Sequence, residues 1–135
     1  MILDVEEVLH VGENTFFSSI LPGNAYGVVF EDDLRTGYLY AVNNTPDLII
    51  LDALHIYDVH NVTDKDKPSK LQIAWTEDGW IASLLINNYC HAIFDFKNKA
   101  GYCRNGFPPA NGSWAVSVNR SLTDGLIKEI FTGIG

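Results

Sequence analysis

Hydrophobic and polar positions alternate along most of the chain in short runs separated by turn residues, a pattern typical of antiparallel hairpins. Two hairpins are expected early: DVEEVLHV (4–11) and TFFSSI (15–20) flank GEN, while AYGVVFE (25–31) and GYLYAVN (37–43) flank DDLRT. The long run DLIILDALHIYDV either bends near Asp52 or continues into a second strand. KLQIAWT, WIASLLI and YCHAIFDF then follow almost without linkers and predict a meander.

The turns between these last three runs predict their register. A two-residue turn in INNY pairs Leu85 with Cys90. A three-residue loop in TEDGW pairs Trp75 with Ile81. Together the two pairings place alternate apolar residues of the three strands, including Cys90, on one face of the sheet.

The same reasoning addresses the two cysteines, Cys90 and Cys103. A turn near Asn98 places Phe94 opposite Cys103, so Cys90 lies four residues further along its strand, about 13 Å away at ~3.4 Å per residue. A disulfide needs Cα atoms within about 7 Å, so both cysteines are expected to be free structural thiols on the apolar face. His91 points to the opposite face, which disfavours a Cys90–His91 catalytic pair.

The segment SLTDGLIKEIF (121–131) changes to helical periodicity and predicts a helix that covers part of the sheet. Ser121 with Asp124 three residues later resembles a capping box at its start, and Gly133 is expected to end it. The predicted fold is α+β: a mostly antiparallel sheet of hairpins and a meander with one C-terminal helix packed on it. The chain is expected to form a single domain over residues 1–135.

The charge distribution is uneven. The chain carries 17 acidic and 9 basic residues, a net charge of −8. Up to Asp66 there are twelve acids and only two bases, Arg35 and Lys65, while the rest of the chain is slightly basic. An acidic surface repels phosphate backbones and attracts basic proteins, so we expect a protein partner and no nucleic acid. The sequence lacks a recognisable signal peptide and an apolar run long enough to span a bilayer, which favours a cytoplasmic protein without membrane contact.

Acidic loop tips are the first candidates for contact with a partner, because loops carry binding function disproportionately. The alternative is that these are ordinary solvated turns. A second candidate is the outward strip of the last predicted hairpin, where an ordinary Asp95–Arg104 ion pair is the simpler interpretation. The candidate partner-binding residues are Glu31, Asp32, Asp33, Asp64, Asp66, Glu77, Asp78, His91, Asp95 and Arg104.

Catalytic chemistry finds little support. The run from Asp52 to Asp66 is rich in Asp and His, but in an extended strand His55 and Asp58 face opposite sides, and the spacing matches no zinc or calcium loop. We therefore expect no metal and no cofactor. Asp52 lies in an apolar run and needs a donor, which His55 or Tyr57 could supply if the strand bulges. The chain has no phosphate-binding glycine loop, nucleophile elbow or HExxH helix, so a non-enzymatic role is expected.

Four long strings carry a family resemblance: VVFEDDLRTGYLYAV, ILDALHIYDV, KPSKLQIAWTEDGW and INNYCHAIFDFKNKAGYCRNGFPP. They resemble a family of small bacterial proteins, the domain of unknown function 2251, over roughly residues 26–131. The resemblance implies a soluble, single-domain bacterial protein and transfers no catalytic residue. Many small acidic bacterial proteins are immunity proteins, an analogy of class only.

The leading hypothesis is therefore an immunity protein that binds and neutralises a toxin without catalysis. Basic toxins such as nucleases would suit the acidic surface. One alternative is a small enzyme or ligand-binding domain that uses Asp52 with His55, or His91 with Arg104. Another is an oligomeric structural or regulatory domain with Trp80 or Trp114 at an interface. The assembly is expected to be a monomer or a small homo-oligomer.

Overall fold

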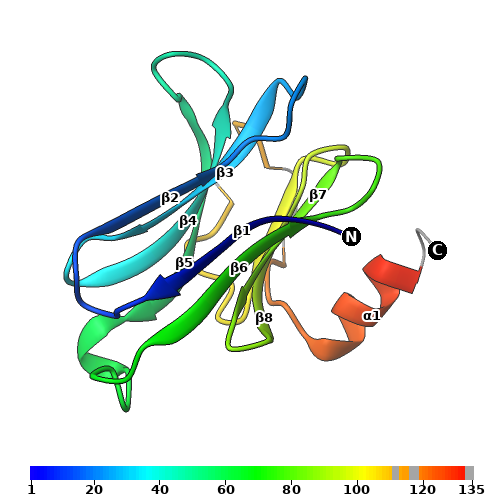
Figure 1. Cartoon of the computed structure of the whole chain (residues 1–135). Helices are drawn as coiled ribbons and strands as arrows, with labels where there is room; N and C mark the ends of the chain where they lie inside the picture. The colour runs from blue at the N-terminus through cyan, green and yellow to red at the C-terminus, as the bar shows by residue number, and fades with distance from the viewer. Residues whose placement is uncertain (111–112, 116–118, 133–135) are drawn as a thin grey trace.

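In the residues that it describes, a computed structural model shows two antiparallel sheets, one α-helix and one short 3₁₀ helix (Figure 1). It describes residues 1–110, 113–115 and 119–132. The five-stranded sheet has the strand order β1-β6-β7-β8-β9, and the four-stranded sheet has the order β2-β3-β4-β5. The elements are β1 (Ile2–Leu9), β2 (Thr15–Ser19), β3 (Tyr26–Asp32), β4 (Thr36–Asn43), β5 (Ile50–Asp58), the short 3₁₀ helix η1 (Val59–Asn61), β6 (Ser69–Trp75), β7 (Ile81–Ile86), β8 (Tyr89–Asp95), β9 (Ala100–Cys103) and α1 (Asp124–Thr132).

The main core lies between the two sheets. Phe30 and Leu39 of the four-stranded sheet and Ile73, Trp75 and Phe94 of the five-stranded sheet belong to one buried cluster. Alternate residues of each strand point into this cluster, which is why the sequence shows a period of two. The expected α+β fold of mostly antiparallel sheet is confirmed, with the strands divided between two layers.

Helix α1 packs on the outer face of the five-stranded sheet, away from the main core (Figure 1). Its apolar residues, among them Leu126 and Ile130, contact a second cluster built on Ile81 and Ile93. The hydroxyl of Thr123 accepts a hydrogen bond from the Leu126 amide at 3.1 Å and so caps the first turn. The capping box predicted for Ser121 is therefore wrong. The expected end of the helix, Gly133, lies outside the described residues.

The first predicted hairpin is also wrong. β1 pairs with β6 and β2 pairs with β3, so the connection between them carries the chain from one sheet to the other. At the opposite end of β2 from this connection, the hydroxyl of Ser19 joins the two layers, donating to Asp4 Oδ2 at 2.6 Å and accepting from Trp75 Nε1 at 2.8 Å. The β3–β4 hairpin and the meander from β6 to β9 are confirmed. The run around Asp52 is one strand, with a register shift at Leu51.

The registers of the meander correct the predicted faces. Leu85 pairs with Cys90 as expected, but Trp75 pairs with Ala82 and not with Ile81. Cys103 pairs with Ala92 and not with Phe94, because the β8–β9 turn consists of residues 96–99 and pairs Asp95 with Ala100. Between β7 and β8, a register shift after Leu84 makes His91 an extra residue. Both cysteines are free, as expected, but they lie on opposite faces: Cys103 in the main core and Cys90 beside the helix.

Candidate functional site

The outer face of the four-stranded sheet carries a row of aromatic and acidic side chains. Phe16 pairs with Glu31, Glu31 pairs with Tyr38, and Tyr38 pairs with His55, one residue from each strand. Cross-strand partners point to the same side of a sheet, so the four side chains lie in one line. We call these four residues, together with Tyr40, the aromatic face. Within the described residues, the helix α1 packs on the other sheet, and the aromatic face has no helix over it.

Ring contacts organise this face. The rings of Tyr38 and Tyr40 stack with 5.8 Å between centroids, and His55 meets Tyr38 edge-on at 5.3 Å. Phe16 is 57% exposed at one end of the row. The strands fix the backbone of each residue, so these rings present a preorganised surface.

Carboxylates surround the two tyrosines. Burial raises the pKa of Tyr40, and the negative charges of Glu31 and Asp33 raise it further. Burial likewise raises the pKa of Tyr38, with the charge of Asp58 as the next cause. Negative potential and electron-rich ring faces together favour a cation at this surface.

His55 is held at the edge of the aromatic face by two side chains. Its Nδ1 lies 2.7 Å from Asn105 Nδ2 and its Nε2 lies 2.9 Å from Asp58 Oδ1. Because the Asn105 amide donates to Nδ1, Nε2 carries the hydrogen and donates to Asp58. The prediction that His55 and Asp58 face opposite sides is wrong, since a register shift at Ile56 changes the alternation. Both ring nitrogens are engaged, so in this arrangement His55 is a positioned structural group and not a free base.

Asp52 has a different donor from those expected. Arg120 Nη2 donates to Asp52 Oδ1 and to the Ala53 carbonyl, each at 3.0 Å, and both side chains of the ion pair are buried. Asp52 pairs across the sheet with core residue Ala41, whereas His55 points outward, so the structure does not bring Asp52 and His55 into one site. Arg120 was not found from sequence because it lies 68 residues from Asp52.

Asp32 was predicted to be a surface contact and is fully buried. Its carboxylate accepts hydrogen bonds from the Gly12 amide at 2.8 Å, the Leu34 amide at 2.9 Å and the Tyr57 hydroxyl at 2.7 Å. Gly37 gives the Tyr57 ring its room, because a Cβ there would lie 2.5 Å from the ring. Asp32 therefore holds the turn end of the β3–β4 hairpin from inside, and its predicted placement as a surface contact is wrong.

The other acidic candidates are at the surface. Asp33 is exposed and accepts hydrogen bonds from the Thr36 and Arg35 amides, which lower the pKa of its carboxyl group. Asp64 and Asp66 are exposed in the turn region before β6. Glu31 is half-buried within the aromatic face.

The predicted strip of His91, Asp95 and Arg104 is divided. Asp95 accepts two hydrogen bonds from Asn98 in the next turn, while Arg104 pairs with Asp124 of α1 at 3.0 Å, so the expected Asp95–Arg104 pair is not formed.

Arg104 instead covers the Tyr89 ring, with 4.2 Å from Cζ to the ring centroid, and the ring of His91 meets Tyr89 edge-on. Burial lowers the pKa of His91 to about 4, and the charge of Arg104 adds to the effect. The strip therefore connects β8 and β9 to the start of the helix.

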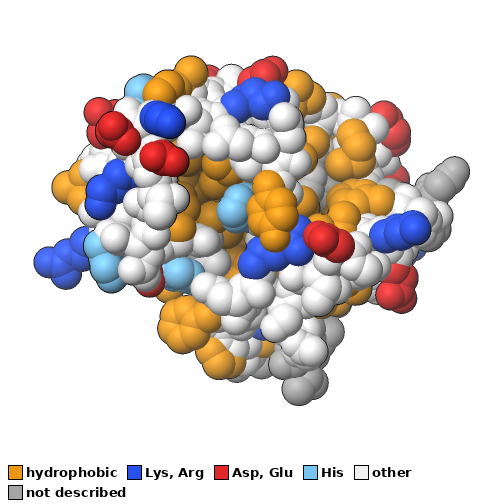
Figure 2. Space-filling view, turned by 90° about the horizontal axis from the view of Figure 1, so that it is seen from below, with side chains coloured by type: hydrophobic (Ala, Val, Ile, Leu, Met, Phe, Trp, Pro, Cys, Tyr) orange, Lys and Arg blue, Asp and Glu red, His pale blue; other side chains and the backbone are white. Residues whose placement is uncertain are grey.

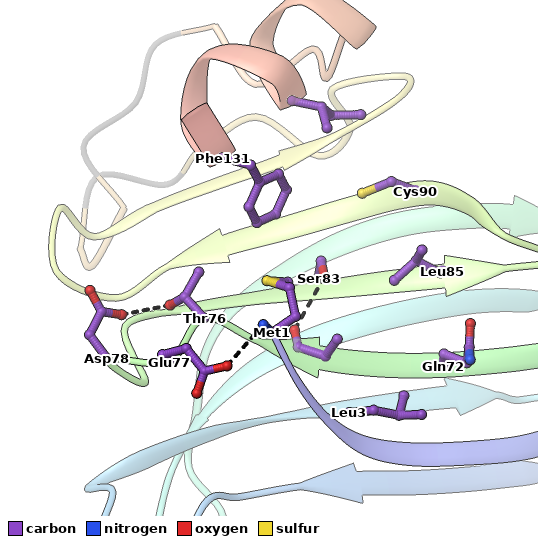
Figure 3. Close-up of a pocket in the computed structure, with 12 residues that line it drawn as sticks. Met1, Leu3, Gln72, Thr76, Glu77, Asp78, Ser83, Leu85, Cys90 and Phe131 are labelled. Carbon is purple, nitrogen blue, oxygen red and sulfur yellow. Dashed lines mark hydrogen bonds and ion pairs between the residues drawn. The ribbon is translucent and has the colours of Figure 1, made fainter. Parts of the chain in front are cut away.

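A groove of about 790 Å³ runs along the outer face of the five-stranded sheet beside the helix (Figure 3). Met1 and Leu3 line it from β1 and the segment before it, and Ile127 and Phe131 line it from α1. The remaining predicted residues, Glu77 and Asp78, lie in the loop at one end of this groove. Acidic and basic side chains stand among exposed hydrophobic ones on the face seen in Figure 2.

The two tryptophans named for an interface are only partly exposed. Trp80 is 39% exposed and its ring stacks on Tyr26 at 5.8 Å. Trp114 meets the core rings of Phe94 and Phe96 edge-on. An oligomeric role for either residue stays a prediction.

Within the described part of the chain, no three or more His, Cys, Asp or Glu side chains are arranged to hold a metal ion. The described helices are all too short or too polar to cross a membrane.

No solved structure matches this chain. A curated relative, described as an uncharacterised protein of Haemophilus influenzae (strain ATCC 51907 / DSM 11121 / KW20 / Rd), is 45% identical over 87 residues. The match covers 62% of this chain and 52% of the relative, so the chain spans about half the length of the curated relative it matches. A family model described as an uncharacterised protein conserved in bacteria matches residues 9–131. The chain therefore belongs to that bacterial family, the domain of unknown function 2251.

Proposed function

We propose that this chain is a non-catalytic binding protein whose aromatic face docks on a basic partner protein. The observation that carries the proposal is the row of Phe16, Glu31, Tyr38 and His55 across four strands, flanked by carboxylates. Tyrosine is enriched among the residues that dominate binding energy at protein interfaces, and this face offers two stacked tyrosines.

The chemistry of the face favours an arginine or lysine of the partner. A guanidinium over Tyr38 or Tyr40 would lie beside Glu31 and gain both a cation–π contact and a charge pair. Cation–π contacts contribute about 0.5 to 2 kcal/mol, depending on how far the cation is desolvated. The net charge of −8 adds long-range attraction for a basic partner.

The narrower form of the proposal is an immunity protein for a toxin with a basic surface, such as a nuclease. Its support is the acidic charge, the rigid β scaffold and the analogy with other small acidic bacterial proteins. A non-enzymatic role agrees with the engagement of both His55 nitrogens and with the separation of Asp52 from His55.

The test uses the proteins encoded by the genes adjacent to this one. Each would be co-expressed with this chain, and growth protection and affinity would be measured at 50 and 300 mM salt. Glu31→Lys and Tyr40→Ala should each weaken binding at least tenfold, and salt should weaken the wild-type complex. The control Glu129→Lys reverses a charge on α1 and should leave affinity within twofold. A complex that is indifferent to salt and to both aromatic-face variants would refute the proposal.

The groove beside the helix favours a second function, the binding of a small ligand. It lies on the other sheet and does not depend on the aromatic face.

A further inference from the structure

The groove lies on the part of the outer face of the five-stranded sheet that helix α1 does not cover. Helix α1 covers Ile81 and Ile93, whereas Leu3 remains 50% exposed and Met1 57% exposed on the far side. Between these two sides the sheet presents small residues, Ala74 and Ser83, which line the groove at its floor and expose little of their own surface. Because small side chains form the floor and larger apolar side chains form both sides, the surface is concave and has room for a ligand.

Most of the lining is apolar or uncharged. Leu85 and Phe131 supply hydrophobic surface along the groove (Figure 3), and Ile127 also lines it. Burial raises the pKa of the Cys90 thiol to about 11, so this group is neutral near pH 7. The Gln72 side chain makes no hydrogen bond within the described part of the chain and lines the groove with a free amide. The interior therefore suits an uncharged, mainly hydrocarbon body.

One end of the groove is acidic. Glu77 and Asp78 lie there in the β6–β7 loop, and none of the described residues that line the groove is a lysine or arginine. Hydrogen bonds from the Thr76 hydroxyl and the Trp80 amide lower the pKa of Asp78, so its carboxylate is charged at neutral pH. The amino group of Met1 already pairs with Glu77 Oε1 at 3.0 Å, so a cationic head group at this end competes with Met1 for Glu77, while Asp78 has no ion-pair partner among the described residues (Figure 3).

We propose that the groove binds a small linear amphiphile that has an apolar tail and a cationic head group, an amine or a quaternary ammonium. The tail lies over Ala74 and Ser83 between β1 and α1, and the head group meets Asp78 and displaces the Met1 amino group from Glu77. From Gln72 to Thr76 the floor strand spans four residues, ~14 Å, which suits a chain on the order of ten carbon atoms. The net charge of −8 raises the local concentration of such a cation and disfavours a fatty-acid anion.

Three probes with the same ten-carbon tail separate the head group from the tail: decylammonium chloride, sodium decanoate and 1-decanol. Affinities would be measured by calorimetry, and the site located by amide shifts of isotope-labelled protein. Decylammonium should bind at least tenfold more tightly than decanoate, with shifts in β6, β7 and α1. Decanoate or decanol binding as tightly as the amine would overturn the head-group assignment. No binding of the amine, or shifts confined to the four-stranded sheet, would overturn the site.

Two variants test the same assignment by different means. The double variant Glu77→Gln, Asp78→Asn changes two exposed loop residues and should reduce the preference for decylammonium over decanoate to threefold or less. Leu3→Lys, at an exposed position in the wall, should weaken decylammonium at least tenfold. Asp64→Asn removes one charge at the far end of β6 and should leave all three affinities within twofold. An unchanged head-group preference in the double variant would contradict the proposal, and this failure would leave the aromatic-face proposal standing.

Discussion

Replacing Asp32 should unfold the protein far more easily than replacing its neighbour Asp33, although the two look alike in sequence. Asp32 is 0% exposed and accepts three hydrogen bonds, from the Gly12 amide, the Leu34 amide and the Tyr57 hydroxyl. Asp32→Ala leaves three donors without a partner, and each buried unsatisfied group costs about 1 to 3 kcal/mol. The three contacts sum to about 3 to 9 kcal/mol, but all three are only part-buried and water can satisfy some of the donors. We therefore expect a loss of about 3 to 6 kcal/mol from a total that is typically about 5 to 15 kcal/mol.

Two milder variants refine the expectation. Asp32→Asn keeps the size but replaces one acceptor with a donor, so an NH₂ group must face either the Leu34 amide or the Gly12 amide. It should cost about 2 kcal/mol or more, while Tyr57→Phe removes one hydrogen bond and should cost about 1 kcal/mol. Asp33→Asn retains an acceptor in an exposed turn and should stay within about 0.5 kcal/mol of wild type.

Urea unfolding followed by tryptophan fluorescence measures these differences, because Trp75 lies in the core between the sheets. The unfolding midpoints should rank wild type and Asp33→Asn together, then Tyr57→Phe, then the two Asp32 variants. If Asp32→Asn unfolded at the wild-type urea concentration, Asp32 would not be the buried hydrogen-bond acceptor that stabilises the hairpin. Equal losses at Asp32 and Asp33 would contradict it as well.

Three further perturbations probe other parts of the fold. Because the pKa of His91 falls from 6.5 in the unfolded chain to about 4 on folding, the unfolded state binds its proton more tightly, and the free energy of unfolding should decrease as the pH drops from 6.5 to 4. The decrease should be about 1 to 2 kcal/mol for this half-buried group, and His91→Gln should remove it in urea titrations at several pH values. Arg120→Met should cost about 3 to 5 kcal/mol in thermal unfolding by leaving Asp52 charged and buried, and adding Asp52→Asn should recover much of the loss. Thr123→Ala should reduce helix stability by about 1 kcal/mol, whereas Ser121→Ala should have almost no effect on the circular dichroism melt.

Local signals predicted the hairpins well where a turn joins two strands of the same sheet. The two-residue turn at Asn87 and Asn88, both with positive φ, sets the pairing of Leu85 with Cys90 without help from the rest of the molecule. The β1–β2 connection gave the same kind of signal, and there the chain passes to the other sheet. Which strands share a sheet depends on contacts between distant segments. The alternation of apolar and polar residues within a strand is the same whether the next strand pairs with it or joins the other sheet.

The buried acids show a second limit of local reasoning. An acid in an apolar run needs a donor, and for Asp52 that expectation holds, but the donor is Arg120 and not a neighbour in the strand. For Asp32 the sequence predicted exposure where the structure shows burial, because three consecutive acids in a hairpin suggest a solvated tip. Strand alternation continues through Asp32 and turns its side chain inward, where Gly12 from the preceding turn supplies a backbone donor.

The groove itself depends on two irregularities that a strict alternation misses. The β6–β7 loop contains four residues between Thr76 and Ile81, with Gly79 at a φ of +75°, and this length turns Ala82 and Leu84 into the core. Leu85 and its correctly predicted partner Cys90 consequently point outward, into the groove. The extra residue His91 then restores the inward orientation of Ala92 and Phe94 further along β8. A pair can thus be predicted correctly and still be assigned to the wrong face, because a loop of one more residue reverses every side chain of the strand that follows it.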